Sequence, residues 1–294
     1  MKDKIYIDEK LRNDLVKAQF NEITEYHIYS RLSRIIRNDG NASVLKKIAD
    51  DEKRHYDFWM EYTGKKIKFS KFKIWYYILL ARLLGLTFAF KLLEKGEQNA
   101  QINYQKISEI IPGAKKIIEE EEEHEHLLIN EIQEEQLNYM GSIVLGLNDA
   151  LVELTGTLAG LTFALQNTQL IALAGSITGI AAAFSMAASE YLSNRSEGKS
   201  DTAIKSATYT GIAYLSTVIL LVLPYLIFTN YYMCLGTTIV IAIFIIFVYN
   251  YYISVAKGFS FKRRFKEMVF LSLGVALFSF GIGILIRKAF GIEI

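Results

Sequence analysis

The sequence has a single cysteine, no segment typical of a leader peptide, and three long runs without charge. Cys234 is the only cysteine among 294 residues, so an internal disulfide is excluded. The opening residues MKDKIYIDEKLRND lack an apolar core, so we expect no signal peptide. The formal net charge is only +2 at pH 7, which gives no reason to expect a nucleic-acid partner.

Charge is distributed very unevenly along the chain. Of the 31 acidic residues, 24 lie at or before Met140, as do 23 of the 33 basic residues. The three uncharged runs all lie after that point, and a membrane-spanning helix needs about 20 apolar residues. We therefore predict a charged domain over residues 1–140 and a membrane domain over residues 141–294, with five spans at residues 142–166, 169–193, 206–228, 232–254 and 268–287.

The connections between the predicted spans differ in charge on the two sides of the membrane. QNTQ and TNYYM on one side contain no charge, whereas the connections on the other side contain eight basic residues: Arg195, Lys199, Lys205, Lys257, Lys262, Arg263, Arg264 and Lys266. Because basic loops stay on the cytoplasmic side, we expect a cytoplasmic front domain and a C-terminus outside.

Few ionisable residues lie inside the predicted spans. Asp149 and Glu153 are four residues apart in the first span and share a helix face. Glu190 lies near the inner end of the second span, with Met186 one turn before it. Carboxylates in a membrane are costly and mark ion paths, and a thioether beside them suits a divalent transition metal. The alternative is that Asp149 and Glu190 lie near the headgroups and only cap or snorkel.

Small residues indicate where the first two spans pack. Gly156 and Gly160 form a GxxxG pattern in the first span, and Gly175 and Gly179 repeat it in the second. Such patterns allow close helix contact in membranes. We expect them to bring the two carboxylate-bearing helices together.

The acidic stretch EEEEHEH in the front domain repeats a pattern found earlier in the chain. Each copy places a Glu-x-x-His pair between apolar residues one turn away on the same helix face: Ile48, Glu52, His55 and Trp59, and then Ile117, Glu121, His124 and Leu128. A solvated charge run needs no such apolar frame. The pairs are therefore predicted to point into a core, where a cation would compensate their charge. His126 falls on another face and is predicted to be a surface residue.

Two further helices are predicted to supply one glutamate each. In both, a glutamate precedes a tyrosine by seven residues and has a companion glutamate three residues away: Glu22 with Tyr29 and Glu25, and Glu97 with Tyr104 and Glu94. Two Glu helices alternating with two Glu-x-x-His helices form the ligand set of a di-iron or di-manganese carboxylate bundle. The chain is thus predicted to be all-α, and the choice between Glu94 and Glu97 as ligand stays open.

The segment between the second and third of these helices is basic at its start and apolar later. The apolar part of residues 66–90 is short for a span, because Arg82 interrupts it. Two placements remain open: the segment lies on the bilayer surface, or it packs against a partner subunit.

These residues resemble two known families. Residues 10–140 resemble the rubrerythrin-like branch of the ferritin superfamily. From GSIVLGLNDALVELTGTLAG through SMAASEYLSNRSEG to the end, the chain resembles the vacuolar iron transporter (CCC1-like) family. The fusion is similar to the membrane-bound ferritins, the erythrin–vacuolar iron transporter proteins of prokaryotes. The resemblance implies a cytoplasmic ferritin-like four-helix bundle joined to a five-helix domain in a prokaryotic inner membrane.

The resemblance also implies a substrate and a mechanism. It implies export of iron(II), or manganese(II), in exchange for protons, by a homodimer with Asp149, Met186 and Glu190 on the path; Glu153 is added by helical spacing. The bundle would hold a di-iron centre in the Fe(II) and Fe(III) states, with Mn(II) or Zn(II) as alternatives, and would capture, sense or oxidise iron.

Other classes of function remain open from the sequence. The chain is alternatively a membrane-anchored di-iron oxidoreductase, either a peroxide reductase or a hydroxylase, whose spans only anchor it. Ferroxidase or peroxidase activity in the bundle is compatible with either class. A third reading is an iron sensor or store.

Overall fold

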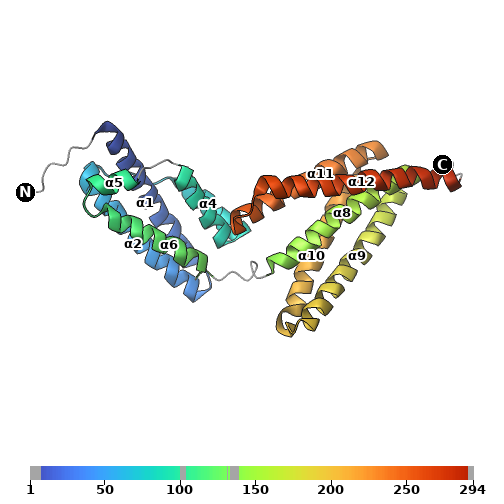
Figure 1. The fold of residues 1–294 in the computed structure, drawn as a ribbon, viewed down its shortest axis with the longest axis horizontal. Coiled ribbons are helices and arrows are strands. Elements are labelled where there is room, and N and C mark those ends of the chain that lie inside the picture. The colour runs from blue at the N-terminus through green and yellow to red at the C-terminus, as the bar shows by residue number, and fades with distance from the viewer. Residues whose placement is uncertain (1–7, 100–103, 131, 133–138, 291–294) are drawn as a thin grey trace, which may run out of the picture. The chain divides into compact units, whose positions relative to one another are not determined.

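The chain forms two compact units, Met1–Glu134 and Glu135–Ile294, shown in Figure 1. This computed structural model describes residues 8–99, 104–130, 132 and 139–290. Every regular element among those residues is an α-helix, which confirms the all-α prediction. Each unit is considered separately below.

The first unit contains short and long helices that follow one another closely. Its described helices are α1 (Glu9–Ile35), α2 (Asp39–Thr63), α3 (Lys71–Leu84), α4 (Leu86–Asn99), α5 (Tyr104–Ile110) and α6 (Ala114–Asn130). Asp8 caps α1 by accepting a hydrogen bond from the Leu11 amide, and Asn38 caps α2 in the same way. Gly64 ends α2 with a φ of 63°, a conformation that glycine adopts without strain.

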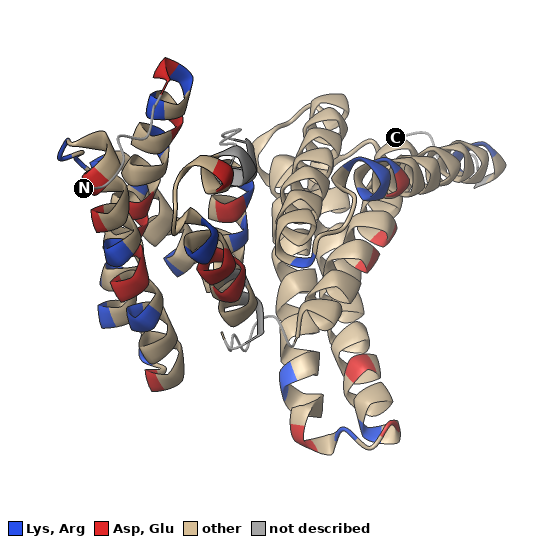
Figure 2. Ribbon diagram, turned by 60° about the vertical axis from the view of Figure 1, so that its left-hand side comes forward, with Lys and Arg blue, Asp and Glu red and all other residues tan. Residues whose placement is uncertain are grey.

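Apolar side chains of the first unit gather between its helices, while its charges lie outside. Leu15 and Ile28 on α1 and Leu45 and Trp59 on α2 are all fully buried. Figure 2 shows many acidic and basic residues along the helices of this unit and few along the long helices of the second. The buried acidic residues described below are therefore exceptions to the charge pattern of their own helices.

The described residues of the second unit form five long helices. They are α8 (Met140–Leu165), α9 (Thr168–Ser196), α10 (Ser200–Ile227), α11 (Tyr231–Lys257) and α12 (Phe261–Phe290). Among the described residues, these five are long and apolar enough to cross a membrane. α12 starts seven residues before the predicted span, because the basic stretch KRRFK continues the helix instead of forming a loop.

Of the four glycines in the first two spans, Gly175 packs as expected, between α9 and α8, and the other three pack against other helices. A Cβ on Gly160 would lie 3.2 Å from the Ser279 carbonyl oxygen, so the GxxxG face of α8 packs against α12 rather than α9. On α9, a Cβ on Gly179 would lie 2.6 Å from Val218 on α10. A GxxxG pattern allows a close approach but does not select the partner helix. α8 and α9 do approach each other at Gly175, where a Cβ would lie 2.7 Å from Leu158 on α8, and they are also linked through Glu190.

α8 and α10 approach each other closely at Gly146. A Cβ there would overlap the backbone carbonyl oxygen of Thr210, and a backbone atom cannot move aside as a flexible side chain can. We expect Gly146→Val to destabilise the second unit by at least about 1–3 kcal/mol, the usual cost of overpacking. Thermal unfolding of the purified protein in detergent measures this.

The matched control is Gly141→Val on the same helix. A Cβ on Gly141 meets no atom within 4 Å, so this change has the same helix-propensity cost without the overlap. Equal unfolding temperatures for the two variants would contradict the close α8–α10 contact.

Candidate metal sites

Four buried or half-buried acidic and histidine side chains converge inside the first unit. Glu22 from α1, Glu52 and His55 from α2 and Glu121 from α6 each offer a ligand atom, and these atoms all lie within 4.8 Å of one another. His55 Nδ1 is 2.9 Å from Glu121 Oε1, 3.7 Å from Glu22 Oε2 and 3.9 Å from Glu52 Oε2. The group contains the nitrogen and oxygen donors that suit iron, manganese and zinc.

The apolar frames of the sequence explain why these side chains point inward. Ile48 and Trp59 are fully buried, so Glu52 and His55, which lie between them on the same face of α2, are 1% exposed. The Trp59 indole N–H donates a hydrogen bond to Glu22 Oε1 at 3.0 Å. That bond orients the α1 carboxylate toward the two residues from α2.

His124 on α6 contacts two members of the same cluster. Its Nδ1 lies 3.3 Å from Glu52 Oε1 and 3.8 Å from Glu121 Oε2, and its ring stacks on His55 with centroids 5.7 Å apart. Glu52 Oε2 and His124 Nδ1 are buried and have no hydrogen-bond partner among the described residues. Buried polar atoms without partners are costly, and a bound cation would satisfy both, so the residues fit a metal centre.

Two acidic residues not predicted from the sequence hold the outer nitrogens of the histidines. His55 Nε2 is 2.8 Å from Glu120 Oε2, and His124 Nε2 is 3.2 Å from Asp51 Oδ2. The arrangement is crossed, because each acid comes from the helix opposite its histidine. A carboxylate on one ring nitrogen leaves the other nitrogen to face a metal. The sequence does contain a signal for these two acids: in both Glu-x-x-His pairs an acidic residue directly precedes the glutamate.

Hydrogen bonds and charge, as well as burial, determine the protonation of this cluster. Burial by itself would lower the pKa of His55, but the carboxylates of Glu121 and Glu22 raise it to about 10. Burial would raise the pKa of Glu120, yet hydrogen bonds from His55 and a nearby arginine lower it to about 2. Burial, followed by the charges of Glu121 and Glu22, raises the pKa of Glu52 well above its usual range. A metal ion must therefore displace protons on binding.

We predict that Glu120 positions His55 for metal binding. Glu120→Ala should weaken Mn(II) binding to the first unit about 10–100-fold, the usual effect of losing an outer carboxylate. Glu120→Gln should restore much of the affinity, because its amide oxygen still accepts the His55 hydrogen bond. Equilibrium Mn(II) binding to the full chain measures both.

Glu119→Ala is the control for this prediction. The Glu119 side chain is 63% exposed and faces Lys115, so its removal should leave the affinity unchanged. Equal affinities for Glu119→Ala and Glu120→Ala would contradict the positioning role.

Of the remaining predicted residues of the first unit, Glu25 lies near enough to Glu52 for its charge to help raise the pKa of that carboxyl. Glu25 and Tyr29 are each 5% exposed, and the Tyr29 ring lies 5.4 Å from Phe90 on α4. Glu94 is half-buried on α4. The side chains of Glu97 and Tyr104 lie outside the described residues.

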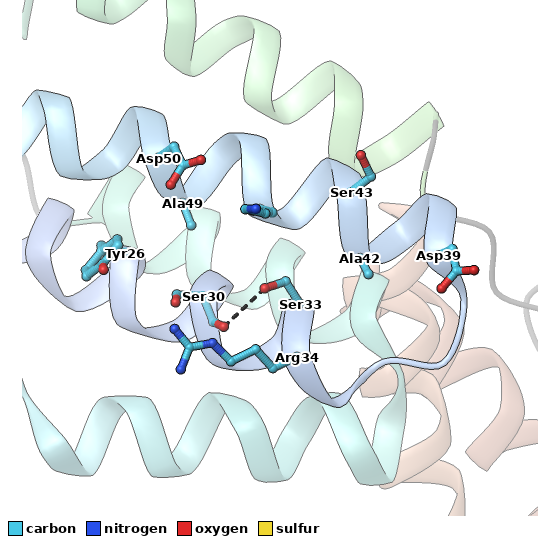
Figure 3. Close-up of a pocket in the computed structure, with 10 residues that line it drawn as sticks. Tyr26, Ser30, Ser33, Arg34, Asp39, Ala42, Ser43, Ala49 and Asp50 are labelled. Carbon is cyan, nitrogen blue, oxygen red and sulfur yellow. Dashed lines mark hydrogen bonds between the residues drawn. The ribbon is translucent and has the colours of Figure 1, made fainter.

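A pocket in the first unit lies apart from this cluster. Figure 3 shows it between α1 and α2, where Arg34 faces the pocket from α1, and Asp39 and Asp50 lie along α2. Its lining includes none of the cluster residues. The metal-binding geometry is therefore a feature of the helix core and not of this surface pocket.

Glu190 links the first two helices of the second unit. Its Oε1 accepts hydrogen bonds from Ser142 Oγ on α8 at 2.8 Å and from Asn194 Nδ2 at 3.0 Å. The side chain is thus held between α8 and α9 by two neutral donors. Sequence reasoning missed Ser142, which lies 48 residues away along the chain.

The other predicted membrane residues are distributed along the same helices. Glu153 accepts a hydrogen bond from the Tyr214 hydroxyl on α10 at 2.8 Å, and Asp149 is half-buried one turn earlier. Met186 packs against the apolar core of this unit. Among the described residues, the carboxylates of this unit form no group comparable with the cluster of the first.

The second unit has the architecture of a multi-pass membrane protein, with five candidate spans in the described part of the chain. Within it, residues 140–203 match the model of the VIT family. The match covers α8, α9 and the start of α10, and thus contains Asp149, Glu153, Met186 and Glu190. Neither the comparison with curated proteins nor that with solved structures finds a match.

Proposed function

We propose that this chain is a membrane transporter that moves iron(II), or manganese(II), out of the cytoplasm. The observation that carries this proposal is the VIT family match over residues 140–203, because it covers all four predicted path residues. In this proposal Glu190, Met186 and Asp149 bind the passing ion with oxygen and sulfur donors. Iron(II) flux into sealed vesicles containing the purified chain tests it.

Neutral polar groups accompany the carboxylates of the proposed path. Asn148 Oδ1 is buried beside Asp149 and accepts no hydrogen bond among the described residues, so it is available to a cation. Glu190 accepts hydrogen bonds from two neutral donors, Ser142 and Asn194. A carboxylate in this setting can exchange a metal ion for a proton. We therefore propose proton antiport as the driving reaction.

We propose that the first unit is cytoplasmic and the C-terminus lies outside. The support is the basic residues around Lys199 and Arg264, compared with the uncharged turns on the other side. A cysteine placed at the exposed Lys199 should react with a membrane-impermeant thiol reagent in inverted vesicles but not in intact cells. Reaction in intact cells would reverse this orientation.

We propose that the transporter works as a homodimer. Glu153 lies within a candidate span and is exposed in the single chain, and a carboxylate facing lipid is costly. A second copy covering this face of α8 would shield it. Sedimentation in detergent should give the mass of two chains, and a monomer that retains full flux would contradict the dimer.

We propose that the cluster of the first unit holds two metal ions, with iron as the physiological metal, and captures, senses or oxidises it. Its unpartnered Glu52 and His124 atoms support metal binding. The same cluster is the observation that favours the second candidate function, a membrane-anchored di-iron oxidoreductase. Peroxide turnover in a sample without metal flux would favour that enzyme over the transporter.

A further inference from the structure

The helix α3 has two apolar faces, and only one of them packs against its own unit. Ile74 and Ala81 point inward and are buried. The opposite side exposes a stripe of large side chains with helical spacing: Phe72 at 71%, Trp75 at 58%, Tyr76 at 37%, Leu79 at 36% and Leu83 at 70%. A contiguous apolar stripe of this kind on a charged unit indicates a partner.

The chain around this stripe carries one sign of charge only. From residue 62 to residue 93 there is no acidic residue, but there are seven basic ones: Lys65, Lys66, Lys68, Lys71, Lys73, Arg82 and Lys91. The five lysines that precede and open α3 are all exposed. Exposed aromatic side chains beside a lysine cluster are typical of a helix that lies in the interface of a bilayer.

We propose that the exposed face of α3 lies on the surface of an anionic lipid bilayer, with the stripe at the acyl boundary and the lysines among the headgroups. This goes beyond the proposed transport function and does not depend on it. The charge favours lipid over a second copy, because two copies of a surface with seven basic and no acidic residues would repel each other.

The short connection between the two units and the length of α3 also support lipid as the occupant of the exposed face. Only nine residues separate Asn130 at the end of α6 from Met140 at the start of the first candidate span, and a chain of that length reaches at most about 32 Å. The first unit is therefore always close to the membrane that holds the second. With 14 residues, α3 itself is shorter than the about 20 residues of a span, so it lies along the bilayer rather than across it.

The two tryptophans of the chain make this placement measurable. Trp59 is fully buried, whereas Trp75 is 58% exposed on the stripe. The full chain is reconstituted in an equimolar mixture of phosphatidylcholine and phosphatidylglycerol, and tryptophan emission is compared with and without brominated acyl chains. We expect brominated lipid to quench Trp75, and we expect this quenching to disappear in Trp75→Phe.

A charge variant tests the electrostatic part of the proposal. Lys66→Gln with Lys68→Gln should reduce the quenching in anionic bilayers and weaken its dependence on salt. The matched control, Lys10→Gln with Lys17→Gln, removes two exposed lysines of α1 and should behave like the parent. If quenching and its dependence on salt are unchanged in the Lys66→Gln Lys68→Gln variant, the assignment to an anionic surface is wrong.

Aqueous iodide distinguishes the remaining occupants. If iodide quenches Trp75 in the bilayer as strongly as in detergent, and brominated lipid does not, the stripe faces water and the proposal is wrong. If neither quencher reaches Trp75, protein covers the stripe. That result would replace the lipid by a second copy of the chain and would equally overturn the proposal.

Discussion

Replacing Asp149 and Glu190 together by alanine is expected to abolish iron(II) flux through the second unit. Both carboxylates lie in the segment that matches the VIT family, and Glu190 is held between α8 and α9 by Ser142 and Asn194. Without them, the path keeps only Glu153 as a negative ligand for a dehydrated cation inside the membrane, where uncompensated charge is costly. We expect at least a tenfold fall in flux, which corresponds to about 1.4 kcal/mol or more in the barrier.

Two further variants separate transport from folding. Glu190→Gln keeps an oxygen that can accept the hydrogen bond from Ser142, so it should preserve the link between α8 and α9 but reduce flux. Glu197→Ala removes a carboxylate only seven residues further on, which is exposed and paired with Lys199 at 2.8 Å, and should leave flux unchanged. Parental flux in the double alanine variant would refute the proposed path.

The second large effect is expected on the affinity of the first unit for metal. Glu52→Ala should weaken Mn(II) binding to the cluster more than about 100-fold, beyond the 10–100-fold effect of an outer carboxylate. The reason is geometric: Glu52 lies 3.3 Å from His124 Nδ1 and 3.9 Å from His55 Nδ1, so it faces both histidines. Electron paramagnetic resonance of free Mn(II) over a titration of the full chain measures the loss.

A histidine pair provides the control for this experiment. His124→Ala should lower Mn(II) binding in the same way as Glu52→Ala. His126→Ala, two residues further on the same helix, removes an exposed imidazole and should not. Equal binding by both histidine variants and the parent would contradict a metal centre in the first unit.

Periodicity explains how far the sequence alone could predict this molecule. Uncharged runs of sufficient length predict five helices, and the described part of the chain contains five candidate spans. Apolar residues one turn on either side of Glu52 and His55 indicate burial, since a helix face repeats every three or four residues. Both properties are local, so they are present in a single stretch of sequence.

The features that the sequence did not predict depend on how helices rotate against one another. The crossed pairs of His55 with Glu120 and of His124 with Asp51 depend on the register between α2 and α6. The contact of Gly160 with α12 likewise depends on which helix lies opposite α8. Helix packing allows several crossing arrangements for one pattern of residues, so these partners follow only from the three-dimensional structure.

The most direct test of the transport proposal is iron(II) entry into liposomes that contain the purified full chain. An iron-sensitive dye inside the liposomes reports the entry under anaerobic conditions, and protein-free liposomes set the background. We expect saturable entry well above this background, in parallel with proton movement in the opposite direction. Entry at the background rate, in protein that still binds metal and turns over peroxide, would contradict transport and assign the chain to the anchored oxidoreductases.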